Sequence, residues 1–84
     1  MSYSLKIKQS ALKEIQKLDK PIRKILIEAI DNLAVNPHVG KPLKGDLSGL
    51  RRIRVGFYRV IYEINEGEVL ILVLRVAHRK DVYR

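Results

Sequence analysis

The sequence contains no cysteine and no tryptophan, and its histidines are His38 and His78. Without cysteine, the chain can form neither a disulfide framework nor a thiolate metal site. The two histidines stand forty positions apart, a spacing that argues against a structural metal site. We therefore expect no bound metal and no cofactor.

Long hydrophobic runs are also missing. The longest run, Val69 to Leu74, falls far short of the roughly 20 apolar residues that cross a bilayer. The N-terminus lacks the hydrophobic region of a signal peptide. We therefore expect a cytoplasmic protein with no membrane partner.

Acidic residues are scarce, with 9 Asp and Glu against 17 Lys and Arg, which gives a net charge of +8. This excess favours a polyanionic partner or an acidic protein partner. Seven of the eight arginines lie at or after Arg51, whereas six of the nine lysines lie at or before Lys24. Arginine presents a planar fork that grips phosphate. The split predicts a scaffold half followed by a phosphate-handling half.

The length of 84 residues predicts one domain, 1–84. So short a chain buries about 60–65% of its unfolded surface, enough for one small core. Boundary signals are Ser10 as a helix N-cap, Pro21 at a first helical position and Pro37 after a helix. The apolar spacing predicts a strand at 3–7, helices at 11–18 and 21–36, a loop at 37–49, and strands at 50–55, 58–64 and 68–76.

The element order β-α-α-β-β-β predicts an α+β fold, in which a helical hairpin packs on an antiparallel sheet. The last three strands would form a meander of two hairpins. Residues 65–67 are the predicted turn of the second hairpin, with Gly67 able to take a positive φ. One sheet face would cover the helices, which leaves the other face available to a partner.

Arginines punctuate the meander. Successive strand side chains point to opposite faces, so Arg52 and Arg54 share one face, and Arg59 alternates with the apolar positions of the next strand. One arginine on a strand is ordinarily solvated or ion-paired, but several with few acids nearby predict a functional basic patch. The acids close in sequence are Glu63, Glu66, Glu68 and Asp81.

The other polar candidates divide between structure and function. Histidine side chains ordinarily titrate near ~6.5, so His78 could act as an acid or base, although a histidine at a strand end more often makes a local hydrogen bond. Tyr58 and Tyr62 fall on an apolar face, which predicts core packing. Tyr83 lies in a charged tail with little reason to be buried, so we expect it to be functional.

Several segments together form a specific pattern of order and spacing. They are Tyr3-x-Leu5-x-Ile7, Ser10-Ala11-Leu12-Lys13-Glu14-Ile15, Lys17-Leu18-Asp19-Lys20, Leu43-Lys44-Gly45, Arg52-Ile53-Arg54-Val55-Gly56, Tyr58-Arg59-Val60-Ile61-Tyr62 and His78-Arg79-Lys80-Asp81-Val82-Tyr83. Over the whole chain this pattern resembles the RelE/ParE superfamily of toxins from type II toxin–antitoxin modules, and specifically its RelE branch.

The resemblance implies a function. RelE-type toxins enter the ribosomal A site and cut mRNA there, as endoribonucleases called mRNA interferases. Cleavage uses the 2′-hydroxyl of the RNA against the adjacent phosphate and needs no metal. The implied partners are the ribosome, mRNA and a cognate RelB-like antitoxin that is acidic and helical.

The resemblance also assigns residues. Arg52 and Arg54 match two basic positions on the second strand of the family, Arg59 matches an arginine on the third strand, and Arg79 one after the last strand. Tyr83 matches a tail tyrosine that stacks on a base or assists proton transfer. These five are the catalytic candidates. Further candidates for RNA binding are Lys44, Arg51 and Lys80.

The chain departs from the family at Arg52 and Arg54, where well-studied relatives carry lysine. A guanidinium does not deprotonate in proteins, so it stabilises developing charge but is a poor general base. In-line positioning of the RNA and charge stabilisation would then supply much of the rate. His78 is the candidate for proton transfer.

Two alternative functions are compatible with the sequence. One is inhibition of DNA gyrase, as in the ParE branch, which shares the fold. The other is a non-catalytic RNA- or protein-binding module. Inhibition of translation without formation of new RNA ends would favour the binding module.

Overall fold

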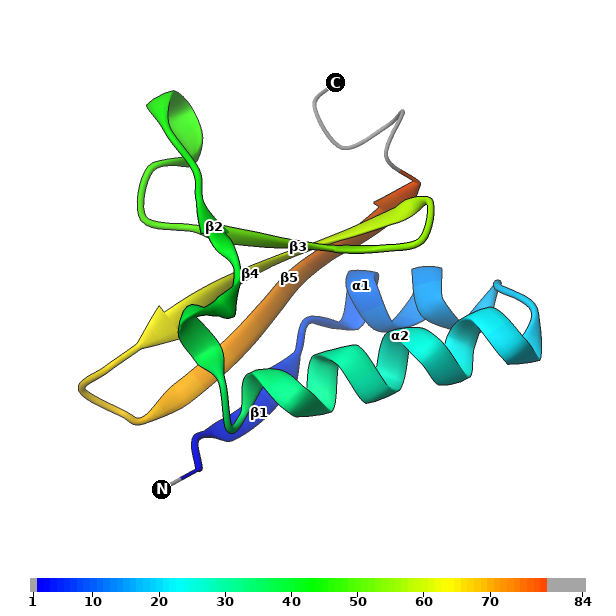
Figure 1. Cartoon of the computed structure of the whole chain (residues 1–84), viewed down its shortest axis with the longest axis horizontal. Helices are drawn as coiled ribbons and strands as arrows, with labels where there is room; N and C mark the ends of the chain where they lie inside the picture. The colour runs from blue at the N-terminus through cyan, green and yellow to red at the C-terminus, as the bar shows by residue number, and fades with distance from the viewer. Residues whose placement is uncertain (1, 79–84) are drawn as a thin grey trace.

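The structure is a computed structural model that describes residues 2–78 (Figure 1). The candidates Arg79, Lys80 and Tyr83 lie outside the described residues. The elements are β1 (Ser4–Ile7), α1 (Gln9–Gln16), α2 (Lys20–Leu33), the 3₁₀ turn η1 (Pro37–Val39), β2 (Lys41–Pro42), the 3₁₀ turn η2 (Gly45–Leu47), β3 (Arg51–Val55), β4 (Tyr58–Asn65) and β5 (Leu70–His78).

The strands of the described part form one five-stranded sheet in the order β1-β5-β4-β3-β2. The predicted α+β class and helical hairpin are confirmed, but the sheet is mixed, because β1 runs parallel to β5. The short strand β2, inside the predicted loop, pairs with Arg51 and Arg52. A parallel pair needs a long crossover rather than a turn, so local sequence carries no signal for it.

The helices begin and end close to the predicted positions. Pro21 lies in the first turn of α2, as its fixed φ favours. The predicted N-cap at Ser10 is wrong, because α1 begins at Gln9 and Lys8 precedes it with no side-chain cap. Tertiary packing stabilises this short helix instead, since Ala11 and Ile15 are buried.

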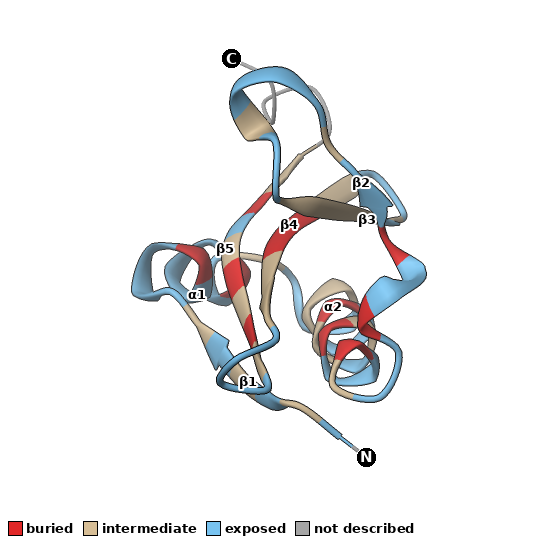
Figure 2. Ribbon diagram, turned by 90° about the vertical axis from the view of Figure 1, so that its left-hand side faces the viewer, coloured by how far each residue is buried: buried red, intermediate tan, exposed pale blue. Residues whose placement is uncertain are grey.

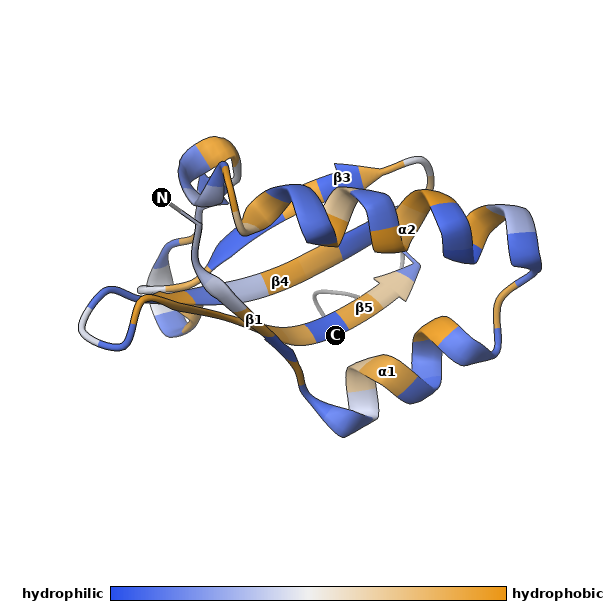
Figure 3. Cartoon of the chain, turned by 90° about the horizontal axis from the view of Figure 1, so that it is seen from below, coloured by the Kyte–Doolittle hydropathy of each residue, from blue (hydrophilic) through white to orange (hydrophobic). Residues whose placement is uncertain are grey.

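The core lies between the helices and one face of the sheet (Figures 2 and 3). Tyr62 is fully buried, which confirms its predicted core position, whereas Tyr58 is half-buried. The helices and strands contribute ten buried side chains to this cluster, namely Ala11, Ile15, Leu26, Ile30, Leu33, Val60, Tyr62, Ile71, Val73 and Val76.

The hairpin turns of the meander differ in their backbone. Gly56 and Phe57 connect β3 to β4, and Gly56 has φ 60°, as expected for a two-residue hairpin with glycine first. In the second turn the positive φ falls on Val69, at 51°, and not on Gly67. The predicted turn was too short, because β5 begins at Leu70 and the Val69 carbonyl accepts a hydrogen bond from Ser4 N–H.

Candidate nucleic-acid interface

Four arginines lie on the sheet face opposite the helices, and we call this set the arginine face. Arg54 pairs with Arg59 across β3 and β4, and Arg52 pairs with Ile61. Ile61 in turn pairs with Arg75 on β5. The residues that alternate with these on β3 and β4, such as Ile53 and Val60, face the helices. The arginine face therefore consists of Arg52, Arg54, Arg59 and Arg75.

Arg75 is the member that sequence reasoning missed. A β-bulge between Ile61 and Tyr62 shifts the β4–β5 register, so Tyr62 pairs with Val73 while Ile61 pairs with Arg75. Val73 and Val76 are both buried on the helix side. Simple alternation from Val73 would place Arg75 toward the helices. Leu74, which has no register partner on β4, is the extra residue of the bulge and turns Arg75 to the opposite face.

Apolar surface lies among these cations. Ile61, opposite the helices, is only 4% exposed. Its partners across the two neighbouring strands are Arg52 and Arg75. Arginine buries its methylene stem along apolar surface while the guanidinium stays in water. Ile61 therefore offers a surface against which the stems of Arg52 and Arg75 can pack.

A hollow of about 380 Å³ adjoins Arg52 and Arg54 at the edge of the sheet. Its other lining residues are Val39, Lys41 and Ile53. The strand β2 pairs only with Arg51 and Arg52 of β3. The hollow therefore extends beside Ile53 and Arg54, which have no partner on β2. Three cationic side chains around a small depression suit a phosphate group.

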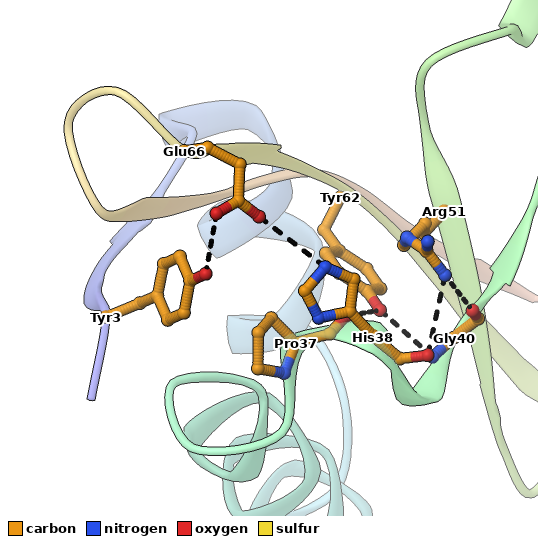
Figure 4. A network of polar contacts seen from close by, with 7 residues as sticks. All are labelled: Tyr3, Pro37, His38, Gly40, Arg51, Tyr62 and Glu66. Carbon is orange, nitrogen blue, oxygen red and sulfur yellow. Dashed lines mark hydrogen bonds and ion pairs between the residues drawn. The ribbon is translucent and has the colours of Figure 1, made fainter. Parts of the chain in front are cut away.

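A buried latch holds the η1 turn against the sheet (Figure 4). The Tyr62 hydroxyl donates a hydrogen bond to the Pro37 carbonyl at 2.5 Å and accepts one from Gly40 N–H at 3.1 Å. Burial raises the pKa of Tyr62 above its ordinary value of 10.0, so the hydroxyl keeps its proton at neutral pH. The latch fixes the backbone that carries Val39 and Lys41 into the hollow.

Arg51 belongs to this latch and not to the arginine face. Its Nη1 donates to the Gly40 carbonyl at 2.7 Å and to the His38 carbonyl at 3.4 Å. Its register partner is the buried Tyr62, which faces the helices. The structure therefore gives Arg51 a scaffold role, while its predicted RNA contact stays a prediction. Lys44 is exposed in the loop before η2.

The exposed side of the latch reaches the β4–β5 turn. His38 Nε2 lies 3.5 Å from Glu66 Oε1. The Tyr3 hydroxyl donates to Glu66 Oε2 at 2.9 Å, and this hydrogen bond to a carboxylate raises the pKa of Tyr3. Glu66 thus connects the residue before β1, the η1 turn and the β4–β5 turn, at the end of the sheet away from His78.

His78 lies at the end of β5 among aromatic rings. Its ring stacks on Phe57, with centroids 6.2 Å apart and 10° between the planes. A second contact, edge to face, joins it to Tyr58 at 5.6 Å. His78 pairs with Tyr58, one residue beyond the Arg54–Arg59–Ala77 row. The structure does not place it on the arginine face.

A larger groove of about 650 Å³ runs between α1 and the part of β5 beyond its pairing with β1. Its apolar walls include Leu18, Leu74 and Val76, and Lys17 and Arg75 also line it. Residues 2–78 contain no cluster of three or more His, Cys, Asp or Glu side chains that could hold a metal ion. Within the same range, no helix is long and apolar enough to cross a membrane.

Comparison with known proteins gives consistent matches. The family model described as "ParE toxin of type II toxin-antitoxin system, parDE" matches residues 5–83. Toxin RelG of Mycobacterium tuberculosis is 36% identical over 86 residues, which cover 100% of this chain and 99% of RelG.

Solved structures of toxin–antitoxin complexes also match. The RelBE2 complex of M. tuberculosis contains a chain 32% identical to this one, with a TM-score of 0.87, covering 94% of this chain and 100% of that chain. In the archaeal RelE–RelB complex from Pyrococcus horikoshii, the matched chain is 31% identical with a TM-score of 0.78, and coverage is 98% and 100%.

Proposed function

The chain belongs to the RelE/ParE superfamily of toxins from type II toxin–antitoxin modules, and from this premise we propose that it cuts mRNA on the ribosome. The observation that carries the proposal is the arginine face. Four arginines from three strands lie together beside a cationic hollow. Such a surface suits a polyanion, and its residues include three candidates predicted from the sequence.

The chemistry we propose is attack of a ribose 2′-oxygen on the adjacent phosphate. A bond forms from that oxygen to phosphorus, and the bond from phosphorus to the 5′-oxygen of the next nucleotide breaks. The 2′-hydroxyl loses a proton and the leaving 5′-oxygen gains one. Arg52, Arg54 and Arg59 would stabilise the charge that develops on the phosphate, as preorganised donors do.

Proton transfer needs a group other than these arginines, because a guanidinium does not deprotonate in proteins. Tyr83 and His78 are the proposed participants. His78 lies beside Phe57 and Tyr58 at the end of the sheet, one residue row from the Arg54–Arg59 pair and with its side chain on the other face, so only RNA that passes round this end of the sheet would meet it. With so little acid–base machinery, holding the RNA in line carries much of the rate. We therefore expect strong cleavage of ribosome-bound message and little cleavage of naked RNA.

Substitution of Arg59 on the arginine face, and of Arg79 as the arginine that the resemblance assigns after β5, tests this proposal. We expect Arg59→Ala and Arg79→Ala each to slow cleavage in a translating extract by about 10²–10³-fold, as loss of one preorganised donor does. Primer extension on the message measures the cleavage. Arg23→Gln on α2 is the matched control, since it removes one positive charge away from the arginine face. Full activity of both alanine variants would refute the site.

A RelB-type antitoxin is the proposed partner that silences the toxin. The matched chains from M. tuberculosis and P. horikoshii come from complexes with RelB antitoxins. Two surfaces of this chain suit an acidic, apolar-striped helix, namely the groove beside α1 and the exposed lysines of the helical hairpin. Those lysines are Lys13, Lys17, Lys20 and Lys24.

Gyrase inhibition is the second candidate, because the matched family model is named for ParE toxins. A supercoiling assay with purified gyrase separates the two candidates. We expect no inhibition at toxin concentrations that stop translation.

A further inference from the structure

Phe57 is a large apolar side chain in a position that neither the core nor the turn requires. It is 66% exposed. The two-residue turn needs glycine at its first position, where Gly56 has φ 60°, but leaves the second position to many residues. The backbone of the turn therefore does not require an aromatic ring at position 57.

The ring is nevertheless held in a defined orientation. It stacks on His78 at a centroid distance of 6.2 Å and an interplanar angle of 10°, within the range of favourable offset stacking. His78 is itself held by Tyr58 at 5.6 Å in an edge-to-face contact. Three rings from β4, β5 and the turn between β3 and β4 thus form one contiguous cluster.

This cluster lies at the end of the sheet, one residue row beyond Arg54, Arg59 and Ala77. Successive side chains on a strand point to opposite faces, so the rings of Tyr58 and His78 lie on the helix side, while Phe57 lies at the tip of the β3–β4 hairpin, two residues from Arg59. A nucleotide whose phosphate contacts Arg59 would bring its base to Phe57 by passing round this end of the sheet. Proteins that bind single-stranded RNA commonly combine a cationic path for the backbone with aromatic rings that stack on bases.

We propose that Phe57, supported from below by His78, is a stacking platform for one unpaired nucleobase next to the phosphate held by the arginine face. The proposal deepens the proposed function and rests on it for the choice of RNA as ligand. It gives His78 a positioning role in addition to any part in proton transfer. The base belongs either to the A-site codon of the message or to ribosomal RNA, and an abasic codon separates these sources.

The first test measures cleavage of ribosome-bound message by Phe57 variants. Loss of one base–aromatic stack corresponds to about 5–150-fold, so we expect Phe57→Ala to slow cleavage within that range. Phe57→Leu keeps an apolar side chain without the aromatic ring and should be equally slow, whereas Phe57→Trp should retain activity. Full activity of Phe57→Ala or Phe57→Leu would overturn the platform.

The second test is spectroscopic and does not depend on cleavage. The chain contains no tryptophan, so Phe57→Trp carries a single indole whose fluorescence a stacked base quenches. A short 2′-deoxy-substituted RNA that cannot be cut should quench this variant, and the same strand with abasic sites should not. Val35→Trp is the control, because Val35 is 67% exposed next to Ala34, which accepts a hydrogen bond from Tyr3 at the far end of the sheet. Equal quenching in both variants would overturn the proposal.

The outcomes separate the two levels of inference. If the wild-type protein does not cut message but bases quench the indole fluorescence of Phe57→Trp, the proposed function fails and the platform stands. If the wild-type protein cuts message and Phe57 variants change neither cleavage nor quenching, only the platform fails. Phe57→Ala could also weaken antitoxin binding while cleavage and quenching stay unchanged. That result would identify Phe57 as a protein contact and would overturn the platform.

An abasic nucleotide in the A-site codon identifies the source of the base. If Phe57 stacks on the message, the abasic codon and Phe57→Ala should slow cleavage no more together than either does alone. If the base is ribosomal, the two effects should multiply.

Discussion

Gly40 is the residue through which the η1 turn approaches the sheet. A β-carbon at this position would collide with the Tyr62 hydroxyl and would lie 2.9 Å from the Arg52 carbonyl oxygen. The same residue donates its N–H to Tyr62 and accepts from Arg51. Glycine is therefore required here because there is no room for a β-carbon. Its φ is one that other residues also adopt.

We predict that Gly40→Ala lowers the free energy of unfolding by about 2–4 kcal/mol, through overpacking and the loss of buried hydrogen bonds. Urea denaturation measures the change. Gly67→Ala is the matched control, because the nearest atom to its added β-carbon is Asn65 Oδ1 at 3.5 Å. We expect the control to change stability by less than about 0.5 kcal/mol. Equal effects of the two substitutions would contradict the latch.

At the scale of elements, strand alternation carried the sequence prediction furthest. Arg52, Arg54 and Arg59 fall on one face because side chains on a strand alternate, and the pairing Arg54↔Arg59 agrees with this. Alternation alone does not place Arg75, because the bulge beside Tyr62 depends on how two strands pair rather than on either strand alone. The Tyr62–Gly40 latch and the parallel β1–β5 pair were unforeseeable for the same reason. Each joins residues far apart in the chain.

Like charges directly opposite on neighbouring strands destabilise a sheet by about 0.2–1 kcal/mol. Arg54 and Arg59 are such a pair. We predict that Arg54→Glu raises the free energy of unfolding by an amount of about that size at low salt, and that this gain shrinks as salt screens the charges. Cleavage of message should fall at the same time.

Thermal and urea denaturation at two salt concentrations measure the stability of this variant. Arg54→Gln is the neutral control and should give a smaller gain. A destabilised Arg54→Glu protein would show that the pair does not repel, and would weaken the view that the face carries this charge for a ligand.

At the scale of the whole molecule, a net charge of +8 gives any polyanion an attraction that carries no specificity. Specific binding needs charges in fixed positions, and the sheet supplies them. Its helix-covered face holds the core, its opposite face carries four arginines, and one end carries the aromatic cluster. Charge and stacking therefore act at adjoining places, and their contributions to binding differ in their dependence on salt.

Salt titration of RNA binding separates these contributions. For single strands, the slope of log K against log salt is about −0.7 per phosphate neutralised, so four arginines should give a slope of about −3. We predict that alanine at Arg52, Arg54, Arg59 or Arg75 makes the slope shallower by about 0.7 each. Phe57→Ala should lower affinity and leave the slope unchanged, because a stacked base releases no counterion.

Fluorescence anisotropy with an uncleavable 2′-deoxy-substituted RNA measures both the affinity and the slope. If the arginine variants bind more weakly with an unaltered slope, these side chains do not contact phosphate, and the charge on this face serves an acidic protein instead.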